Sequence, residues 1–279
     1  MSKIRQLAPL LFLLVSACVP KAFLLEQPKL VSVYFERKIE KLEKAKSPDL
    51  DSQRLLMRTK VEYGFGIIME QASRLIDEDY KQAMAKYEQA NKIFAEARDT
   101  GILIISKRYP SFNNWLNKEA SIDFNADDMN DIYWLAASIG GCISSSRGDP
   151  FELINLPNVG RLLRTGIDIN PEWGSGSFFS AMISFTTTRS DLNEIMLRDS
   201  VDYYFDKAIL YSDGKDAGPY LAYAESIHKP FQERKNFVDK LNYVINMENK
   251  PNNEFELTNL LAKSRAKWLL ARTEEYFLE

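Results

Sequence analysis

The stretch VGRLLRTGIDINP, residues 159 to 171, has the spacing expected for the second helix of a helical hairpin. Val159 and Leu163 are large apolar residues one helical turn apart, and Gly166 follows on the same side. The large residues would fill the hairpin, and the glycine would let two helices approach closely. Pro171 would end the unit, because proline cannot continue a helix. The stretch therefore predicts a fold of paired helices.

The same spacing is similar to that of a tetratricopeptide repeat, and three further segments repeat it. VDYYFDKAILYSDG at 201–214 repeats it with Asp213 in place of the proline, AMAKYEQA at 83–90 repeats it, and FVDKLNYV at 237–244 does so loosely. Positions 166 and 208 are 42 residues apart, against about 34 in a regular repeat. The sequence therefore predicts degenerate tetratricopeptide-like repeats, and an irregular bundle of helical hairpins is the alternative.

Helical patterns continue through almost the whole chain, and no segment shows the sustained alternation of a strand. A short helix is expected at 30–46, a long helix at 52–77 and another from residue 79. Further helices are expected to start near residues 127, 157, 171, 194, 219, 231 and 253, several of them at a proline, which suits the first helical position. The predicted fold class is all-α, with stacked antiparallel helical hairpins in one domain at 51–279.

The N-terminus has the layout of an exported lipoprotein. Two basic residues precede an apolar run from Leu7 to Val15, which is too short to span a bilayer. The sequence VSAC, ending at Cys18, resembles a bacterial lipobox, in which the cysteine becomes the acylated first residue. We therefore expect a lipoprotein signal peptide at 1–17, lipidation of Cys18, and a lipidated tether with an N-terminal helix at 18–50. An ordinary signal peptide that contains a cysteine is the alternative.

Composition and charge exclude several classes of function. The formal charge is −3, and it becomes more negative without the signal peptide, so we expect no nucleic-acid partner. No later stretch is apolar enough to span a bilayer, so membrane attachment is expected through the lipid alone. Val19 is not the aspartate associated with inner-membrane retention, which favours a periplasmic location on the inner leaflet of the outer membrane. Cys142, the second cysteine, is expected to be a small buried hydrophobe.

No pattern in the chain indicates catalysis. His228 is the only histidine, and its place at a helix end suggests a solvated or capping imidazole. The usual zinc-hydrolase and serine-hydrolase motifs are missing from the sequence. WGSGS at 173–177 lacks the lysine and the strand of a phosphate loop, so it is expected to be a flexible helix start. We therefore predict a protein that is not an enzyme and has no metal and no cofactor.

Four blocks of the chain carry a family resemblance. They are DIYWLAASIGGCISSSRGDP, LPNVGRLLRTGIDINPEWGSGSFFSAM, DSVDYYFDKAILYSDGKDAGPYLAYAESI and LAKSRAKWLLARTEEYF. Together they resemble the T component of tripartite ATP-independent periplasmic (TRAP) transporters that carry tetratricopeptide repeats. The resemblance implies an exported lipoprotein of stacked helical hairpins that forms a homotrimer and partners the periplasmic solute-binding P component. It also implies an apolar channel in each protomer that passes ligand to or from that partner.

Aromatic residues crowd residues 173 to 223, which makes this region the candidate binding site. The helix expected from 171 is apolar on two faces and belongs in the middle of the array. Arg265 stands between leucines on the last helix, so it must be paired if it is buried, with a carboxylate of the protein or of a ligand. Each ring could equally be core packing. The candidate channel residues are Trp173, Phe178, Phe179, Tyr220 and, as a polar anchor, Arg265.

Two functions follow from these observations. The first is a TRAP transporter lipoprotein that associates with the P component and helps to pass a small, partly apolar ligand, since stacked rings give contact area without charge. The second is a scaffold lipoprotein of envelope assembly that holds a protein partner in a repeat groove. An apolar tunnel closed to solvent favours the first function, and an open concave face favours the second.

Overall fold

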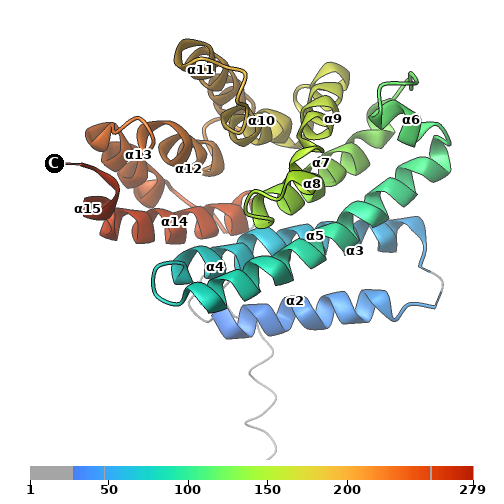
Figure 1. The fold of residues 1–279 in the computed structure, drawn as a ribbon, viewed down its shortest axis with the longest axis horizontal. Coiled ribbons are helices and arrows are strands. Elements are labelled where there is room, and N and C mark those ends of the chain that lie inside the picture. The colour runs from blue at the N-terminus through green and yellow to red at the C-terminus, as the bar shows by residue number, and fades with distance from the viewer. Residues whose placement is uncertain (1–27, 47, 252, 279) are drawn as a thin grey trace, which may run out of the picture.

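The computed structural model describes residues 28–278, apart from residues 47 and 252. Cys18, the signal peptide and the tether up to residue 27 lie outside the described residues. Within those limits the chain is helical and contains no strand (Figure 1). The prediction of an all-α fold is therefore confirmed, and so is the prediction that no sheet forms in this part of the chain.

Long helices of the N-terminal part form the lower layer in Figure 1. Helix α2 packs on α3, and α3 packs on α5. The long helix expected at 52–77 is a continuous run of α3, a π-helical segment η2 and α4. The elements of this layer are α2 (Pro28–Glu43), α3 (Leu50–Tyr63), η2 (Gly64–Met69), α4 (Glu70–Leu75) and α5 (Tyr80–Arg108).

The middle of the chain continues the stack above that layer, with α7 packed between α5 and α9. A capping box precedes α7, because the Asp128 carboxylate accepts a hydrogen bond from the Asn125 backbone N–H at 2.9 Å. The elements here are α6 (Phe112–Leu116), η3 (Ala126–Asp128), α7 (Met129–Ser145), α8 (Pro150–Leu153) and α9 (Leu156–Ile169).

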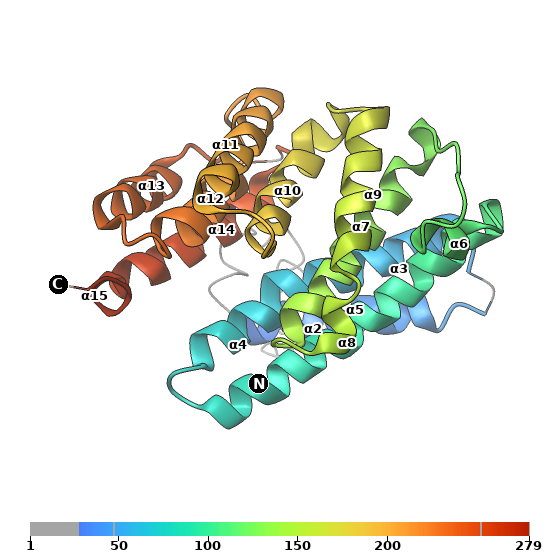
Figure 2. The same ribbon diagram turned by 45° about the horizontal axis from the view of Figure 1, so that its top comes forward.

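The C-terminal part turns back toward the first layer, and α14 runs below α12 and α13 (Figures 1 and 2). Helix α10 packs on both α9 and α11, and α13 pairs with α14. The elements are η4 (Trp173–Gly176), α10 (Ser177–Thr187), α11 (Glu194–Tyr211), α12 (Gly218–Tyr223), η5 (Ala224–His228), α13 (Arg234–Asn246), α14 (Glu256–Ala271) and α15 (Thr273–Tyr276).

The helix expected from residue 171 begins later, at Ser177. Gly174, Ser175 and Gly176 have φ values of 55°, 53° and 83°, which belong to the left-handed region. A right-handed α-helix cannot pass through these values, so α10 starts only after them. The WGSGS segment therefore leads into α10, while its predicted flexibility stays a prediction.

Close approach of α9 and α10 depends on glycine, as the opening stretch predicts. A Cβ atom on Gly166 would overlap the ring of Phe178, and one on Gly160 would overlap the ring of Phe185. The two phenylalanines of α10 therefore fill notches on α9. The geometry confirms the role of Gly166, while the repeat character of the whole chain stays a prediction.

Cys142 is fully buried in the core between the lower layer and α7, in the same hydrophobic cluster as Phe94. Burial raises the pKa of its thiol to about 12, so the thiol is neutral and packs as a hydrophobe. The prediction for this cysteine is confirmed.

His228 differs from its prediction, because it is buried rather than solvated. It lies in the π-helical segment η5, which turns the ring inward against Tyr223, with 4.9 Å between ring centroids. Its Nδ1 lies 2.6 Å from a carboxylate oxygen of Glu233. The sequence places His228 at a helix end, but it does not show that the folded chain buries the ring.

Candidate functional site

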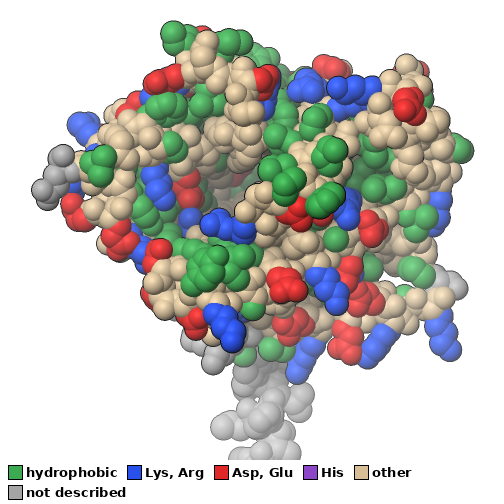
Figure 3. All heavy atoms as spheres, in the orientation of Figure 1, with side chains coloured by type: hydrophobic (Ala, Val, Ile, Leu, Met, Phe, Trp, Pro, Cys, Tyr) green, Lys and Arg blue, Asp and Glu red, His purple; other side chains and the backbone are tan. Residues whose placement is uncertain are grey.

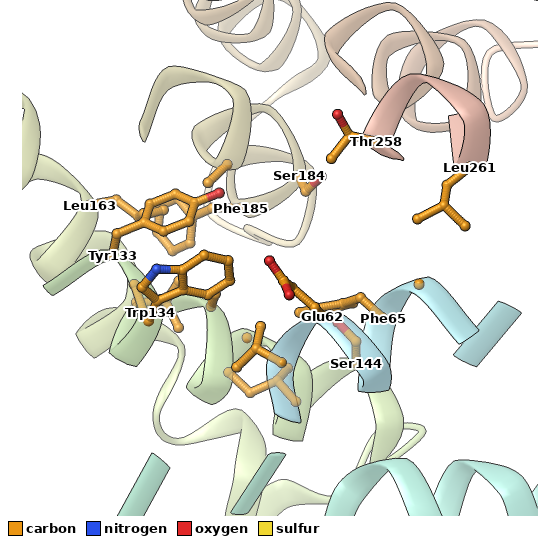
Figure 4. Close-up of a pocket in the computed structure, with 18 of the residues that line it drawn as sticks. Glu62, Phe65, Tyr133, Trp134, Ser144, Leu163, Ser184, Phe185, Thr258 and Leu261 are labelled. Atoms are coloured by element: carbon orange, nitrogen blue, oxygen red, sulfur yellow. The ribbon is translucent and has the colours of Figure 1, made fainter. Parts of the chain in front are cut away.

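A cavity of about 510 Å³ lies where three distant parts of the chain meet. Its walls come from α2, α3 and η2 of the lower layer, from α7, α9 and α10, and from the beginning of α14 (Figure 4). The volume lies in the range that holds small organic ligands, about 300 to 1,000 Å³. Most of the lining residues are apolar, and we take this cavity as the candidate site.

The lower wall is formed by the π-helical segment η2. Phe65, Gly66 and Ile67 are consecutive in the sequence, and all three line the cavity. The extra residue in a π-helical turn widens the helix, and such turns occur often at functional sites. Phe65 keeps 40% of its surface exposed despite its large ring, so its side chain has room on the cavity side.

Helix α7 supplies the longest wall. Tyr133 and Trp134 stand at its first turns, and the small residues Ala137, Gly140 and Ser144 follow at helical spacing. A Cβ atom on Gly140 would meet no atom within 4 Å. The row of small side chains therefore leaves the space that the cavity occupies.

The far wall combines α10 with α14, which are separated by some seventy residues of chain. Ala181, Ser184 and Phe185 line it from α10, and Thr258 and Leu261 line it from α14. Figure 4 shows Thr258 and Leu261 facing the aromatic side across the opening. This wall exists only because the C-terminal hairpin folds back on the first layer.

Among the described residues that line the cavity, Glu62 is the only charged one. Its carboxylate accepts a hydrogen bond from Nε of Arg58 at 2.7 Å, and the Arg58 guanidinium lies 5.4 Å from the centre of the Trp134 ring. Figure 4 shows the carboxylate beside Trp134, directed toward the interior. The cavity thus has one acidic, hydrogen-bond-accepting group in a mostly apolar wall, to which a few hydroxyl side chains also contribute.

Tyr133 adds a hydrogen-bond donor. Burial, together with the charge of Asp216, raises the pKa of its hydroxyl to about 12. The hydroxyl is therefore protonated at neutral pH and can donate a hydrogen bond.

Trp173 and Phe178, predicted from the sequence as channel residues, lie directly behind this wall. Their rings are 5.2 Å apart, and they pack against Tyr133 at 5.2 and 5.3 Å respectively. Phe178 is fully buried. Neither residue is among those that line the cavity, so the cluster predicted from sequence supports Tyr133 from behind.

Phe179 and Tyr220 lie further from the cavity and are also absent from its lining. Phe179 stacks on Tyr211 of α11, with centroids 5.5 Å apart and planes 23° apart. Tyr220 packs against Phe205 and Tyr243 at 5.2 and 4.6 Å. Both rings join neighbouring helices of the C-terminal half.

Arg265 is paired, as its position on α14 predicts, and its partners belong to the protein. It donates hydrogen bonds to the Glu225 carboxylate from Nε at 3.2 Å and from Nη2 at 2.8 Å. Its Nη1 donates a hydrogen bond to the Ser73 hydroxyl at 2.9 Å. A weaker contact of 3.4 Å reaches Glu70. The residue therefore connects α14 to η5 and to α4, and it does not line the cavity.

The residues that do line the cavity include several that sequence reasoning passed over, chiefly Glu62, Phe65, Tyr133 and Trp134. The signal on α7 is visible in YWLAASIGGCISS, residues 133–145, where small residues recur at spacings of three and four beside two large rings. A helix with a small-residue face can border a void, but only the fold shows that no other side chain fills it.

A second hollow, of about 600 Å³, lies near the end of α13 and the segment after it. Most of its lining side chains are polar or charged, among them Asp239, Asn242 and Lys250. It therefore offers little contact for an apolar ligand.

The described residues, 28–278 without 47 and 252, contain neither a membrane-spanning helix nor a metal-binding cluster. In that part of the chain, no helix is both long and apolar enough to cross a bilayer. No cluster of three histidine, cysteine, aspartate or glutamate side chains in the same region could hold a metal ion.

The described part of the chain is thus all-helical and encloses a mostly apolar cavity, a feature that small-molecule sites share. Comparison with protein families matches residues 38–277 to the TRAP transporter T-component family. The chain therefore belongs to this family, whose members are components of a transporter rather than enzymes. A search of curated proteins finds no match.

Proposed function

We propose that this protein is a periplasmic lipoprotein that assists a TRAP transporter by holding a small, partly apolar ligand in the cavity between the lower layer, α7, α10 and α14. The single observation that supports the proposal is the cavity itself, because its volume and its apolar lining suit such a ligand. Glu62 and Tyr133 would hydrogen-bond the polar end of the ligand, and the rings of Phe65 and Trp134 would cover its apolar body.

A cavity-filling variant tests this function. Gly140→Leu places a side chain into the open space beside α7 without a clash at its Cβ atom. The neutral fluorescent probe N-phenyl-1-naphthylamine should bind the original protein, with one site per protomer, and should lose most of its affinity for the variant. Ala85→Leu adds the same side chain at an exposed position of α5 and should leave binding unchanged. Equal binding by all three proteins would show that the ligand site lies elsewhere.

The partner would be the solute-binding P component of the same transporter. Pull-down of that protein by the original chain and by Gly140→Leu, followed by measurement of ligand transfer within the complex, separates two functions. A ligand-passing role predicts that the complex forms in both cases but that ligand transfer fails in the variant. A scaffold role predicts an intact complex with no effect on any ligand, because the cavity would then have no part in the function.

The anchor is a further part of the proposal and depends on the sequence around Cys18. Acylation of this thiol would hold residues 18–50 as a tether and N-terminal helix at the inner leaflet of the outer membrane. Labelled palmitate should appear on the original protein and be missing from Cys18→Ser. Label on the Cys18→Ser protein would contradict the assignment.

We also propose a homotrimer, on the resemblance to the family alone. The mass by light scattering should be three times the protomer mass, which is 32.1 kDa before removal of the signal peptide. A monomer at micromolar concentration would contradict it.

A further inference from the structure

One face of α2 has a continuous exposed stripe. Its residues recur at steps of three and four, which keeps them on a single side of the helix. The first three are apolar, with 53%, 40% and 58% of their surfaces exposed, and the rest are basic and exposed. The α2 stripe consists of Leu30, Val33, Tyr34, Arg37, Lys41 and Lys44.

The acidic residues of α2 do not belong to this stripe, and each has a partner. Glu36 accepts a hydrogen bond from the Tyr63 hydroxyl at 2.8 Å, and Glu43 lies 2.6 Å from Nζ of Lys60. Glu40, at the edge of the stripe, pairs with Lys44. Arg37 and Lys41 therefore form a positive centre on the outer face, directly after the apolar turn.

The charge of this segment is opposite to that of the rest of the domain. Residues 29–46 contain six basic and three acidic residues, whereas residues 47–279 contain 27 basic and 35 acidic residues. Figure 3 shows Lys and Arg side chains along the lower edge of the molecule, where Figure 1 places α2. A basic segment on an acidic protein selects a negatively charged surface.

We propose that the α2 stripe rests on an anionic lipid bilayer. The inference uses the lipid anchor of the proposed function: Pro28 is the tenth residue after Cys18, and a chain of that length reaches at most about 35 Å. Helix α2 is therefore held close to the headgroups. Leu30, Val33 and Tyr34 enter the interface with their apolar surfaces, and the cations bind lipid phosphates, as amphipathic helices of this kind do.

The face of α2 opposite the stripe lines the cavity, so contact with the bilayer would also orient the cavity. Val31 and Phe35 are buried on that face and line the cavity. Helix α2 is thus a single layer between the bilayer and the ligand site, and α11 and α13 point away from the membrane (Figure 1). The cavity of the anchored protein is therefore oriented, with its α2 wall toward the lipid.

Vesicle binding of the unlipidated Cys18→Ser protein tests the contact without the anchor. The protein should sediment with vesicles of phosphatidylethanolamine and phosphatidylglycerol and not with vesicles of neutral phosphatidylcholine. Arg37→Gln/Lys41→Gln should weaken the partition about 25-fold, because each cation near an anionic surface contributes about fivefold. The control Lys118→Gln/Lys267→Gln removes the same charge from exposed positions after α6 and on α14 and should retain nearly the full partition.

Three results would overturn the proposal. The first is a lack of binding to the anionic vesicles, and the second is an equal loss in both double variants, which would indicate a general charge effect. The third is unchanged vesicle binding by Arg37→Gln/Lys41→Gln with an altered mass in light scattering, which would assign the stripe to contacts between copies of this chain. Palmitate labelling of Cys18 is independent of all three results. The lipidation of Cys18 can therefore be correct even if the α2 stripe does not contact the bilayer.

A fluorescent label tests the orientation in the lipidated protein. Cys142 is buried and Cys18 would be acylated, so a thiol-reactive nitrobenzoxadiazole dye attaches to an introduced cysteine. On vesicles, the emission of Val33→Cys should shift to the blue, and that of Lys267→Cys on α14 should not. The same emission at both positions would contradict the orientation.

Discussion

Gly140 and Gly141 are neighbours on α7 and face opposite environments. A Cβ atom on Gly140 would enter the cavity and meet nothing within 4 Å, whereas one on Gly141 would overlap the ring of Phe94. A Cβ atom on Gly64 of η2 would overlap the same ring. Phe94 thus fills the space between the lower layer and α7 at Gly141. The preceding residue, Gly140, borders the cavity.

The two glycines should respond to alanine with opposite signs. Gly140→Ala should raise the free energy of unfolding by about 0.5–1 kcal/mol, because alanine restricts the unfolded chain and favours the helix. Gly141→Ala should lower it by about 1–3 kcal/mol, because the core around Phe94 has no room. Urea denaturation of the two variants measures both effects. Changes of equal sign would show that the environments are alike.

Phe178 and Phe65 provide a test of which rings are core. Phe178→Ala should cost about 3–5 kcal/mol, because the ring is fully buried against α9 and Tyr133. Phe65→Ala should cost much less, since its ring is 40% exposed and borders the cavity. Probe binding should change in the opposite order, with the larger loss of affinity for Phe65→Ala. A large loss of stability in Phe65→Ala would place that ring in the core.

Glu62 should make the cavity prefer neutral ligands to anionic ones. A long-chain alcohol should bind about tenfold more tightly than the matching carboxylate, since a remaining repulsion of about 1.4 kcal/mol gives that factor. Calorimetry should show the difference shrinking in Glu62→Gln. Glu88→Gln, at an exposed position of α5, removes the same charge and should leave the preference unchanged. A carboxylate that binds the original protein more tightly than the alcohol would contradict the assignment.

Arg265 should act on stability and not on ligand binding. Arg265→Met leaves Glu225 without its bidentate partner, and we expect a loss of about 3 kcal/mol, because the side chain is only 17% exposed. Arg234→Met breaks the more exposed pair with Glu274 and should cost less than about 1 kcal/mol. Probe affinity should be equal in both folded variants. Lost affinity with unchanged stability in Arg265→Met would make Arg265 a ligand anchor.

His228 should make stability depend on pH. Burial, assisted by the charges of Lys240 and Arg198, holds the pKa of its imidazole below the ordinary value of 6.5, although the hydrogen bond to Glu233 opposes the shift. The unfolded chain therefore takes up the proton first, so stability is full above about pH 6.5 and falls as the pH decreases below it. Melting temperatures between pH 7.5 and 5.5 should show this decline. His228→Gln should flatten it, and an unchanged slope in that variant would assign the effect to other groups.

The sequence by itself determined the helices and their main contacts. Periodic apolar positions predict a helix from residue 79, and α5 begins at Tyr80, because one buried face repeats every three or four residues whatever the neighbour is. The role of Gly166 is local as well, since only a missing side chain admits a ring at that spacing. The burial of Cys142 follows in the same way from its place on an apolar helix face.

Only the tertiary structure decided which side chains border the cavity. Periodicity shows that α10 is apolar on two faces, but it does not show that Phe178 and Phe185 pack against glycines of α9 while Ser184 borders the cavity. Glu62 and Leu261 are two hundred residues apart in the chain, and they share one cavity because α14 folds back onto the first layer. A cavity forms where no side chain from another helix fills the space beside a residue. Long-range packing of the helices decides which side chains fill that space, and the residue's own segment does not.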